Sequence, residues 1–394
     1  MSLFIASLLV TLAVQIQASL VVFTPPILAP VAQGDVGVNA ASVGLVTALI
    51  YLSAVPSALF SGVLISRLGA IRVSQLCVLF TSLGIALMST GDVLIIALGA
   101  LVVGLGYGAV TPSSSTVLAD QAPKNMRSLI FSIKQSGVPI GGAIAGALVP
   151  YLMYRFGWRE TSIIIGWIGL VVILLAQIIQ KKVDRQPFNA VHQLSSPSLL
   201  KPLRFVFSHA KLRELAISSF AFSGMQMSLG SYLVVMLTEK ALLTVSVAGS
   251  ALSIAMIAGI FGRLFWGGLA DYGVSPRSVL GVLGLLMGVS AGAMCFVHAS
   301  FPITVIYIFS FFFGASAVGW NGVYLAEVAR IAPAGQAGTA TGASLAMTYS
   351  GVVLLPVLFW FIHSVTESYV WGFLALGFVT VWRGLVFFRK IEQQ

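Results

Sequence analysis

Two cationic side chains lie deep inside apolar segments of the sequence, where a charge is costly without a partner. Lys134 follows Arg127 by seven residues, and Arg263 precedes Asp271 by eight. On a helix, these spacings place both cations about 10–12 Å from the nearest polar loop. An arginine offers a planar fork to a carboxylate, and a lysine offers a mobile point charge. The chemistry that these residues predict is the binding of a small organic anion.

A purely structural interpretation of the same cations stays open. Arg263 can pair with Asp271 or cap the ends of neighbouring helices, and Lys134 can extend its long stem to the membrane surface. We expect Arg383, near the end of the last apolar segment, to extend in that way. No carboxylate lies within the apolar segments near Lys134 and Arg263. Two such cations close together need an anion, a neutral lysine or water.

Uncharged polar side chains within the apolar segments are the other candidates for binding. Buried amides and phenols need hydrogen-bond partners, which a neighbouring helix or a substrate can supply. The residues to which we assign substrate contacts, besides Lys134 and Arg263, are Gln15, Tyr51, Tyr107, Gln135, Gln226, Trp320, Asn321 and Tyr349.

Other small-residue patterns predict packing rather than chemistry. Cys77 and Cys295 lie in apolar runs with no His or carboxylate at ligand spacing, so we expect neither a metal site nor a disulfide. The glycines of residues 104–108 lie inside an apolar segment and follow no strand, which argues against a nucleotide-binding loop. Glycines at this spacing favour close contact between helices. We expect no cofactor.

The elements that must position these residues are membrane-spanning helices. The chain has 394 residues, of which 58% are apolar and only 8% charged, and its mean hydropathy is +1.02. A soluble domain is usually about one quarter charged, so an ordinary soluble enzyme is excluded. About 20 apolar residues span a bilayer. Twelve predicted spans cover residues 3–31, 40–65, 72–91, 94–119, 129–152, 161–180, 213–237, 244–268, 278–297, 302–326, 336–362 and 367–388.

The distribution of Lys and Arg indicates the orientation of these spans. With the amino terminus in the cytoplasm, fifteen of the 21 Lys and Arg residues fall in cytoplasmic loops. Only Arg155, Arg159 and Lys240 fall in outer loops, and three more lie inside spans. Both termini are therefore predicted to be cytoplasmic. The net charge of +10 then faces anionic lipid, and we expect no nucleic-acid partner.

The longest polar stretch, residues 181–212, divides the chain into two halves. It is basic and contains three prolines, so we interpret it as a cytoplasmic linker with a short surface helix near Leu203–His209. The domains are then a six-helix bundle at 1–180, the linker, and a second six-helix bundle at 213–394. The halves echo each other, since the loop at residues 62–69 resembles the loop at residues 267–273. Such a repeat predicts two pseudo-symmetric bundles with a pathway between them.

Twelve spans, a 6+6 repeat, a basic central loop and the sequence Gly267-Gly268-Leu269-Ala270-Asp271 after an even-numbered span resemble the major facilitator superfamily. The resemblance covers the whole chain and implies an all-α fold of twelve transmembrane helices. The chain departs from the pattern in its first loop, where Ser66 stands in place of the acid. It also has no basic residue in the fourth span. These departures weaken any mechanism that needs those groups in the first half.

A narrower resemblance involves the eighth span. Residues 263–271, Arg263 to Asp271, are similar to the pattern of monocarboxylate and oxalate/formate carriers, in which the arginine binds the substrate carboxylate. Gly259 stands where the mammalian branch often has Asp, and the first span has no Lys, so the proton coupling of those carriers is not supported. In the superfamily fold the fifth and eighth spans are neighbours across the two halves. The resemblance thus implies that Lys134 and Arg263 face one cavity.

These observations lead us to expect a secondary active or facilitative transporter that moves a small organic anion, a carboxylate, by alternating access. Arg263 would anchor the carboxylate and Lys134 would supply a second charge. Asp271, near Arg127 by pseudo-symmetry, would act as a gate, and Pro25 with Pro26 would either bend the first span to close the outer mouth or form a static kink. We expect a monomer in a prokaryotic cytoplasmic membrane.

Two other classes of function stay open. Aromatic-rich spans, and residues 137–142, which are similar to the Gly-Pro motif of exporting antiporters, favour proton-coupled efflux of drug-like or amphipathic compounds. Such a substrate would not need the two cations. A membrane receptor or membrane enzyme is the third class, but the sequence shows no signalling domain and no nucleophile–base pair. The coupling ion and the direction of transport stay open.

Overall fold

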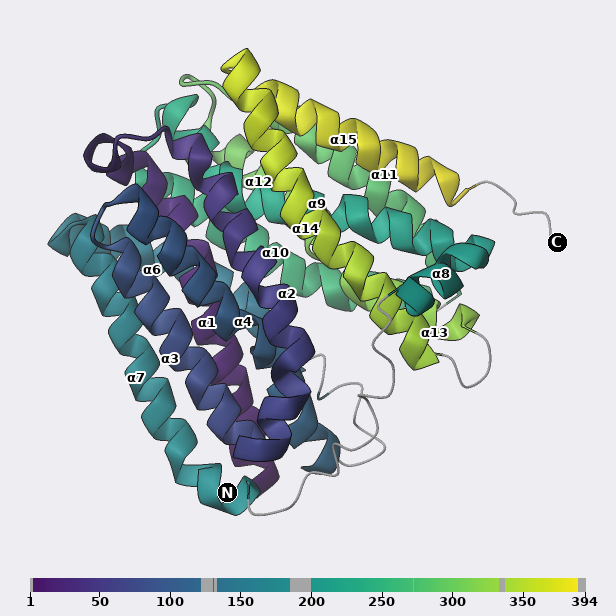
Figure 1. Cartoon of the computed structure of the whole chain (residues 1–394). Helices are drawn as coiled ribbons and strands as arrows, with labels where there is room; N and C mark the ends of the chain where they lie inside the picture. The colour runs from purple at the N-terminus through teal and green to yellow at the C-terminus, as the bar shows by residue number, and fades with distance from the viewer. Residues whose placement is uncertain are drawn as a thin grey trace. The chain divides into compact units, whose positions relative to one another are not determined.

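The computed structural model consists of α-helices (Figure 1). It describes residues 3–121, 130, 133–184, 200–271, 273–332 and 337–388, and no strand occurs among them. Twelve segments of these residues are long and apolar enough to cross a membrane, which confirms the predicted number. The chain separates into two compact units, Met1–Ser195 and Ser196–Gln394.

The first unit contains six membrane-spanning segments. Its first helix runs five residues beyond the predicted span, and the fifth span starts at Ile133, just before its regular helix. The elements are α1 (Leu3–Val36), a 3-10 turn (Ala40–Ser42), α2 (Val43–Leu68), α3 (Ala70–Met88), α4 (Val93–Gln121), α6 (Gly137–Phe156) and α7 (Trp158–Val183).

The second unit begins with a short helix where one was predicted and then adds six further spans. Its tenth span, Ile303–Val328, is divided into two helices. The elements are α8 (Leu200–Ser208), α9 (Ala210–Glu239), α10 (Val245–Asp271), α11 (Pro276–Met294), α12 (Ile303–Ala317), α13 (Asn321–Ile331), α14 (Ala337–Thr366) and α15 (Tyr369–Val386).

The two units repeat the same pairing of helices. In the first unit α1 packs on α6, α2 on α4 and α3 on α7; in the second, α9 packs on α14, α10 on α12 and α11 on α15. In both units the first span therefore pairs with the fifth, the second with the fourth and the third with the sixth. The repeat seen in the sequence is a repeat of the fold.

Glycines allow these pairs to approach closely. A Cβ added to Gly141 of α6 would lie 2.6 Å from the carbonyl oxygen of Ile16 in α1. One added to Gly108 of α4 would overlap the Ala54 carbonyl of α2, and one on Gly314 of α12 would overlap the Ala255 carbonyl of α10. Lipid tails are as apolar as the side chains, so close packing rather than hydrophobic burial holds such helices together.

A carboxylate from α7 caps α3. Asp184, just after α7, accepts hydrogen bonds from the backbone N–H groups of Ile71 (Oδ1, 3.0 Å) and Arg72 (Oδ2, 3.0 Å). Gly69, at φ +93°, precedes α3, and an added Cβ there would overlap Asp184. An acid at a helix N-terminus satisfies unpaired N–H groups and favours the helix dipole. Ser66, which stands in place of the expected acid, lies near the end of α2, and the α2–α3 junction receives a carboxylate from Asp184, which is distant in the sequence.

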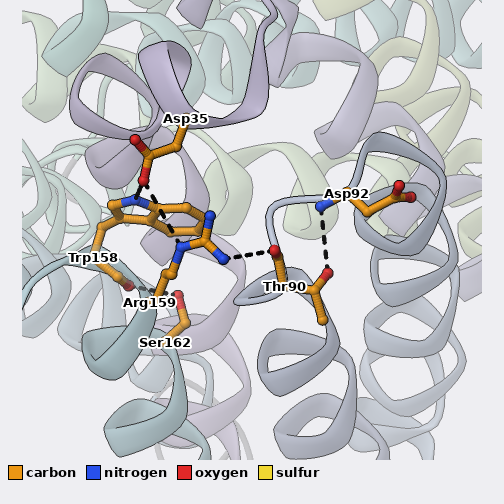
Figure 2. Close-up of polar contacts among 6 residues, drawn as sticks. All are labelled: Asp35, Thr90, Asp92, Trp158, Arg159 and Ser162. Atoms are coloured by element: carbon orange, nitrogen blue, oxygen red, sulfur yellow. Dashed lines mark hydrogen bonds and ion pairs between the residues drawn. The ribbon is translucent and has the colours of Figure 1, made fainter.

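The carboxyl end of α1 is fastened to the start of α7 (Figure 2). Trp158 donates its indole N–H to Asp35 at 2.9 Å, and the Arg159 side chain donates to the carbonyl oxygen of Thr90 at 2.7 Å while lying 3.8 Å from the same carboxylate. These contacts tie together the ends of α1, α3 and α7.

The helix α1 continues through Pro25 and Pro26 without interruption, and a third proline follows at Pro30. The missing N–H groups therefore do not break the helix. Pro25 lines an apolar hollow beside the Asp35 contacts, together with Leu28, Ile85 and Trp158. A role of these prolines in closing a pathway stays a prediction.

The close contact between α1 and α6 gives a stability prediction. Gly141→Ala places a methyl group against the Ile16 carbonyl, and we expect it to lower stability by about 1–3 kcal/mol, the usual cost of overpacking. Thermal unfolding of the purified protein in detergent measures this. The control is Gly292→Ala in α11, where an added Cβ meets no atom within 4 Å. Equal melting temperatures for the two variants would contradict the packing argument.

Candidate functional site

The ammonium group of Lys134 lies in the interior of the first unit. Its side chain is 0% exposed. The Nζ atom donates to Gln15 Oε1 at 2.8 Å, to Gln135 Oε1 at 3.1 Å and to Thr111 Oγ1 at 3.2 Å. Lysine has three N–H donors, so this set can use all of them. The alternative in which Lys134 extends to the membrane surface is therefore excluded, because three oxygens hold the ammonium inside.

Three helical segments bring these oxygens together. Gln15 comes from α1 and Thr111 from α4, and Gln135 adjoins Lys134 just before α6. An added Cβ on Gly137 would lie 2.9 Å from the side chain of Gln15, so the glycine lets α6 start against α1. Pro139 has no N–H for the carbonyl of Gln135, which explains why the regular helix starts only after this residue.

The Lys134 charge is solvated by oxygens but pairs with no carboxylate among the described residues of its unit. All three oxygens belong to neutral side chains. The ion pairs of the described residues are Arg159–Asp35, Arg277–Glu214 and Arg330–Glu327, and none includes Lys134. Gln15 lies about 7 Å from the midpoint of α1 at 1.5 Å per residue, well within a hydrocarbon core of about 30 Å. A full positive charge at that depth calls for an anion.

Two predicted tyrosines lie next to this group. Tyr107 precedes Thr111 by one helical turn on the same face of α4. Its ring meets the ring of Tyr51 from α2 edge to face, with centroids 5.5 Å apart and planes at 71°. The structure thus brings Gln15 and Gln135 to the Lys134 ammonium and places the Tyr107–Tyr51 pair one turn of α4 from Thr111, while their contact with substrate stays a prediction. Thr111 is not singled out by the sequence analysis, although its spacing from Tyr107 is a usable signal.

Arg263 in the second unit caps a helix end. Its Nε donates to the carbonyl oxygen of Val318 at 3.1 Å, and Trp266, one turn later, donates to the carbonyl of Ala315 at 3.0 Å. Both carbonyls lie where α12 ends, and the negative end of a helix dipole favours a cation. The structural interpretation of Arg263 as a helix cap is confirmed, and its contact with substrate stays a prediction.

Trp320 and Gln226 form a pair in the core of the second unit. Trp320 is 0% exposed, and its indole N–H donates to Gln226 Oε1 at 3.0 Å. Its ring meets Phe222 edge to face at 5.8 Å and Tyr324 at 5.2 Å. Of the other candidates, Asn321 begins α13, and Tyr349 of α14 is 38% exposed. Substrate contacts for these four residues stay predictions.

Arg383 does not extend to the surface as predicted. It is 6% exposed and donates to Ser218 Oγ and to the backbone carbonyl of Glu214, both at 3.1 Å. These oxygens come from the first turns of α9, where the Glu214 carboxylate is paired with Arg277 at 2.6 Å. The prediction fails because a neighbouring helix supplies oxygens that hold the guanidinium in the core.

The predicted gate falls largely outside the described residues. Asp271 is the last residue of α10, but its side chain is not described, and Arg127 lies in the undescribed residues 122–129. The side chain of another acid, Glu327 of α13, is described. It is 0% exposed and accepts two hydrogen bonds of 2.7 Å from Arg330. The gate role of Asp271 and Arg127 stays a prediction.

Among the described residues, twelve segments long and apolar enough to span a membrane form two repeating bundles, and each bundle holds buried charged side chains, as in a multi-pass membrane protein of the transporter class. The sequence profile of the Major Facilitator Superfamily matches residues 3–356, and the chain belongs to this family. The superfamily consists of transporters, so the protein is a transporter and not an enzyme.

Individual relatives agree with this assignment. The chain is 22% identical over 385 residues to a hexuronate transporter of Bacillus subtilis (strain 168), which covers 93% of this chain and 89% of the relative. It is 25% identical over 314 residues to a benzoate transport protein of Acinetobacter baylyi, covering 71% and 65%. The solved structure of the nucleoside transporter NupG has a TM-score of 0.80 at 13% identity, over 98% and 99% of the two chains, and shows the fold alone.

The Trp320–Gln226 pair gives a second stability prediction. Trp320→Phe keeps an aromatic ring but leaves the Gln226 amide oxygen without its donor. We expect a loss of about 1–3 kcal/mol, the cost of an unsatisfied buried acceptor. The matched control is Trp371→Phe on α15, where Trp371 is 58% exposed and a change within about 0.5 kcal/mol is expected. Chemical or thermal unfolding measures the stability of each variant. A Trp320→Phe variant as stable as the unmodified protein would show that the hydrogen bond contributes nothing to stability.

Proposed function

We propose that this protein carries a small organic carboxylate across a prokaryotic cytoplasmic membrane and that the ammonium of Lys134 binds the carboxylate. One observation carries the proposal, namely a fully buried lysine inside a membrane-spanning segment that three neutral oxygens solvate and that pairs with no carboxylate among the described residues of its unit. The substrate supplies the missing negative charge. Hexuronate and benzoate, the substrates named for two relatives, are both carboxylates, which supports the choice.

The neighbouring amides make the site adjustable. A carboxylate that replaces one neutral oxygen on Nζ gains a charge-assisted hydrogen bond, which is about twice as strong as a neutral one. Gln15 donates its amide N–H to Ser19 at 3.3 Å, a long and weak bond. The same amide can turn its N–H toward the second carboxylate oxygen. The substrate carboxylate and the amides then both accept hydrogen bonds from the ammonium. The Lys134 charge, whose burial costs free energy without substrate, becomes part of an ion pair when substrate is bound.

Transport follows by alternating access, with the two bundles rocking about the site and both termini in the cytoplasm. We further propose that Arg263 supplies a second cation for the carboxylate while it retains its capping bond to Val318. We assign Asp271 and Arg127 to the cytoplasmic gate. This arrangement assigns binding to the centre of the protein and gating to its inner end.

The binding proposal is tested with Lys134→Gln. We expect thermal stabilisation of the purified protein by benzoate or glucuronate to disappear in the variant, because a ligand stabilises the state that binds it. Loss of a charged hydrogen bond is worth about 1.5–3 kcal/mol, a factor of roughly ten to a hundred in affinity. Lys182→Gln, an exposed lysine at the end of α7, is the control. Stabilisation by lipophilic cations alone, unchanged in Lys134→Gln, would refute the proposal and favour efflux of amphipathic compounds.

The gate proposal predicts a different kinetic signature. Asp271→Asn keeps the shape of the side chain but removes its charge, and we expect slower transport in proteoliposomes with unchanged equilibrium affinity for the carboxylate. Asp92→Asn is the matched control, because Asp92 caps the start of α4 through a side-chain oxygen that Asn also has. A large loss of affinity in Asp271→Asn would place the residue in the binding site instead of the gate.

A further inference from the structure

We infer that the carboxylate bound at Lys134 belongs to an aromatic acid whose ring packs against Tyr107 and Tyr51. The inference rests on the proposed function and adds the class of substrate. It starts from the position of the tyrosine pair. Tyr107 lies one turn of α4 before Thr111, whose hydroxyl accepts a hydrogen bond from Lys134, and its ring contacts the ring of Tyr51.

The tyrosine pair lies at mid-height of the first unit. Tyr107 is the central residue of α4, with fourteen residues before it and fourteen after it. Thr111 follows by four residues, or about 6 Å along the axis. A ligand whose charge rests on the Lys134 ammonium therefore has the phenol rings about one turn away, toward the start of α4. In an aromatic acid the carboxylate is attached directly to the ring, which suits this short separation between charge and aromatic surface.

The rings are held firmly in place. Gly106 and Gly108 flank Tyr107, and an added Cβ on either would collide with a neighbouring backbone, that of Cys77 in α3 or of Ala54 in α2. Gly104 makes the same kind of contact with the Ile50 carbonyl of α2. Helix α4 is therefore locked against two neighbours on both sides of Tyr107. A fixed ring surface costs little entropy when a ligand binds to it.

The geometry of the pair leaves a role for a third ring. Tyr51 is 6% exposed, whereas Tyr107 is only partly buried, so Tyr107 presents the accessible surface. Aromatic rings associate edge to face or offset, the arrangement that these two already adopt with each other. A hexuronate instead carries hydroxyl groups around its ring, each of which needs a hydrogen-bond partner when buried. Carbon surface next to the cation thus favours a flat, unsubstituted ring over a sugar acid.

The first test compares ligands on the unmodified protein and so does not depend on a variant folding. Affinities for benzoate, cyclohexanecarboxylate, acetate and glucuronate are measured by calorimetry on the purified full chain. We expect benzoate to bind about threefold to tenfold more tightly than cyclohexanecarboxylate, which is the factor that one aromatic contact supplies. The affinity ratio of benzoate to acetate, and of benzoate to glucuronate, is expected to be larger than this. Glucuronate binding as tightly as benzoate would overturn the inference.

The second test uses variants of Tyr107. Tyr107→Leu is expected to lower benzoate affinity about threefold to tenfold and to leave acetate affinity unchanged, while Tyr107→Phe retains benzoate binding. Tyr154→Leu is the control, since Tyr154 is 87% exposed on α6. Equal benzoate affinity in Tyr107→Leu and the unmodified protein would also overturn the inference. If Lys134→Gln binds every carboxylate as well as the unmodified protein does, the proposed function itself is refuted. That result differs from one in which only the Tyr107 variants bind benzoate normally, which refutes the aromatic-acid inference alone.

Discussion

A positive charge inside a membrane-spanning bundle must be surrounded by oxygen atoms, and the first unit is arranged around that requirement. The Lys134 side chain is 0% exposed, and its ammonium donates to the oxygens of Gln15, Gln135 and Thr111. Those oxygens come from three segments, and they converge only if α1, α4 and the start of α6 approach closely. Gly137 and Gly141 allow that approach. The glycines and the buried charge are thus parts of one arrangement.

Much of this arrangement could be predicted from the sequence, because its causes are local. Long apolar runs predict spans, and a lysine inside one predicts a special environment. The partners of Lys134 could be nominated only as a class of buried polar residues. Thr111 escaped because a threonine in a spanning helix ordinarily bonds to its own helix, as Thr116 does to the Pro112 carbonyl. Which hydroxyl turns outward depends on helix packing, which no single segment encodes.

The surface position predicted for Arg383 and the surface alternative left open for Lys134 fail for one physical reason. Both side chains have long stems, and a long stem allows a charge to reach the membrane surface. Both remain inside because a neighbouring helix offers oxygens at close range, from Gln15 in one case and Ser218 in the other. Reaching the surface would leave those buried oxygens without these donors. The choice between the two outcomes is therefore made by tertiary contacts, and the same holds for the Arg263 bond to Val318.

The remaining cations of the two units show why Lys134 stands apart. In the second unit the Arg277 and Arg330 charges are paired with Glu214 and Glu327. Arg263 bonds to the electronegative end of a helix, so its charge has a local counterpart. Among the described residues, the Lys134 ammonium contacts only neutral dipoles, which can reorient but carry no net charge. In the proposed function a transported anion gains most at Lys134, because its own charge completes this cationic environment, and it loses that gain when it departs. Binding that gains its free energy from a single ion pair is favourable but moderate in strength. Moderate affinity suits a carrier, because a carrier must release what it binds.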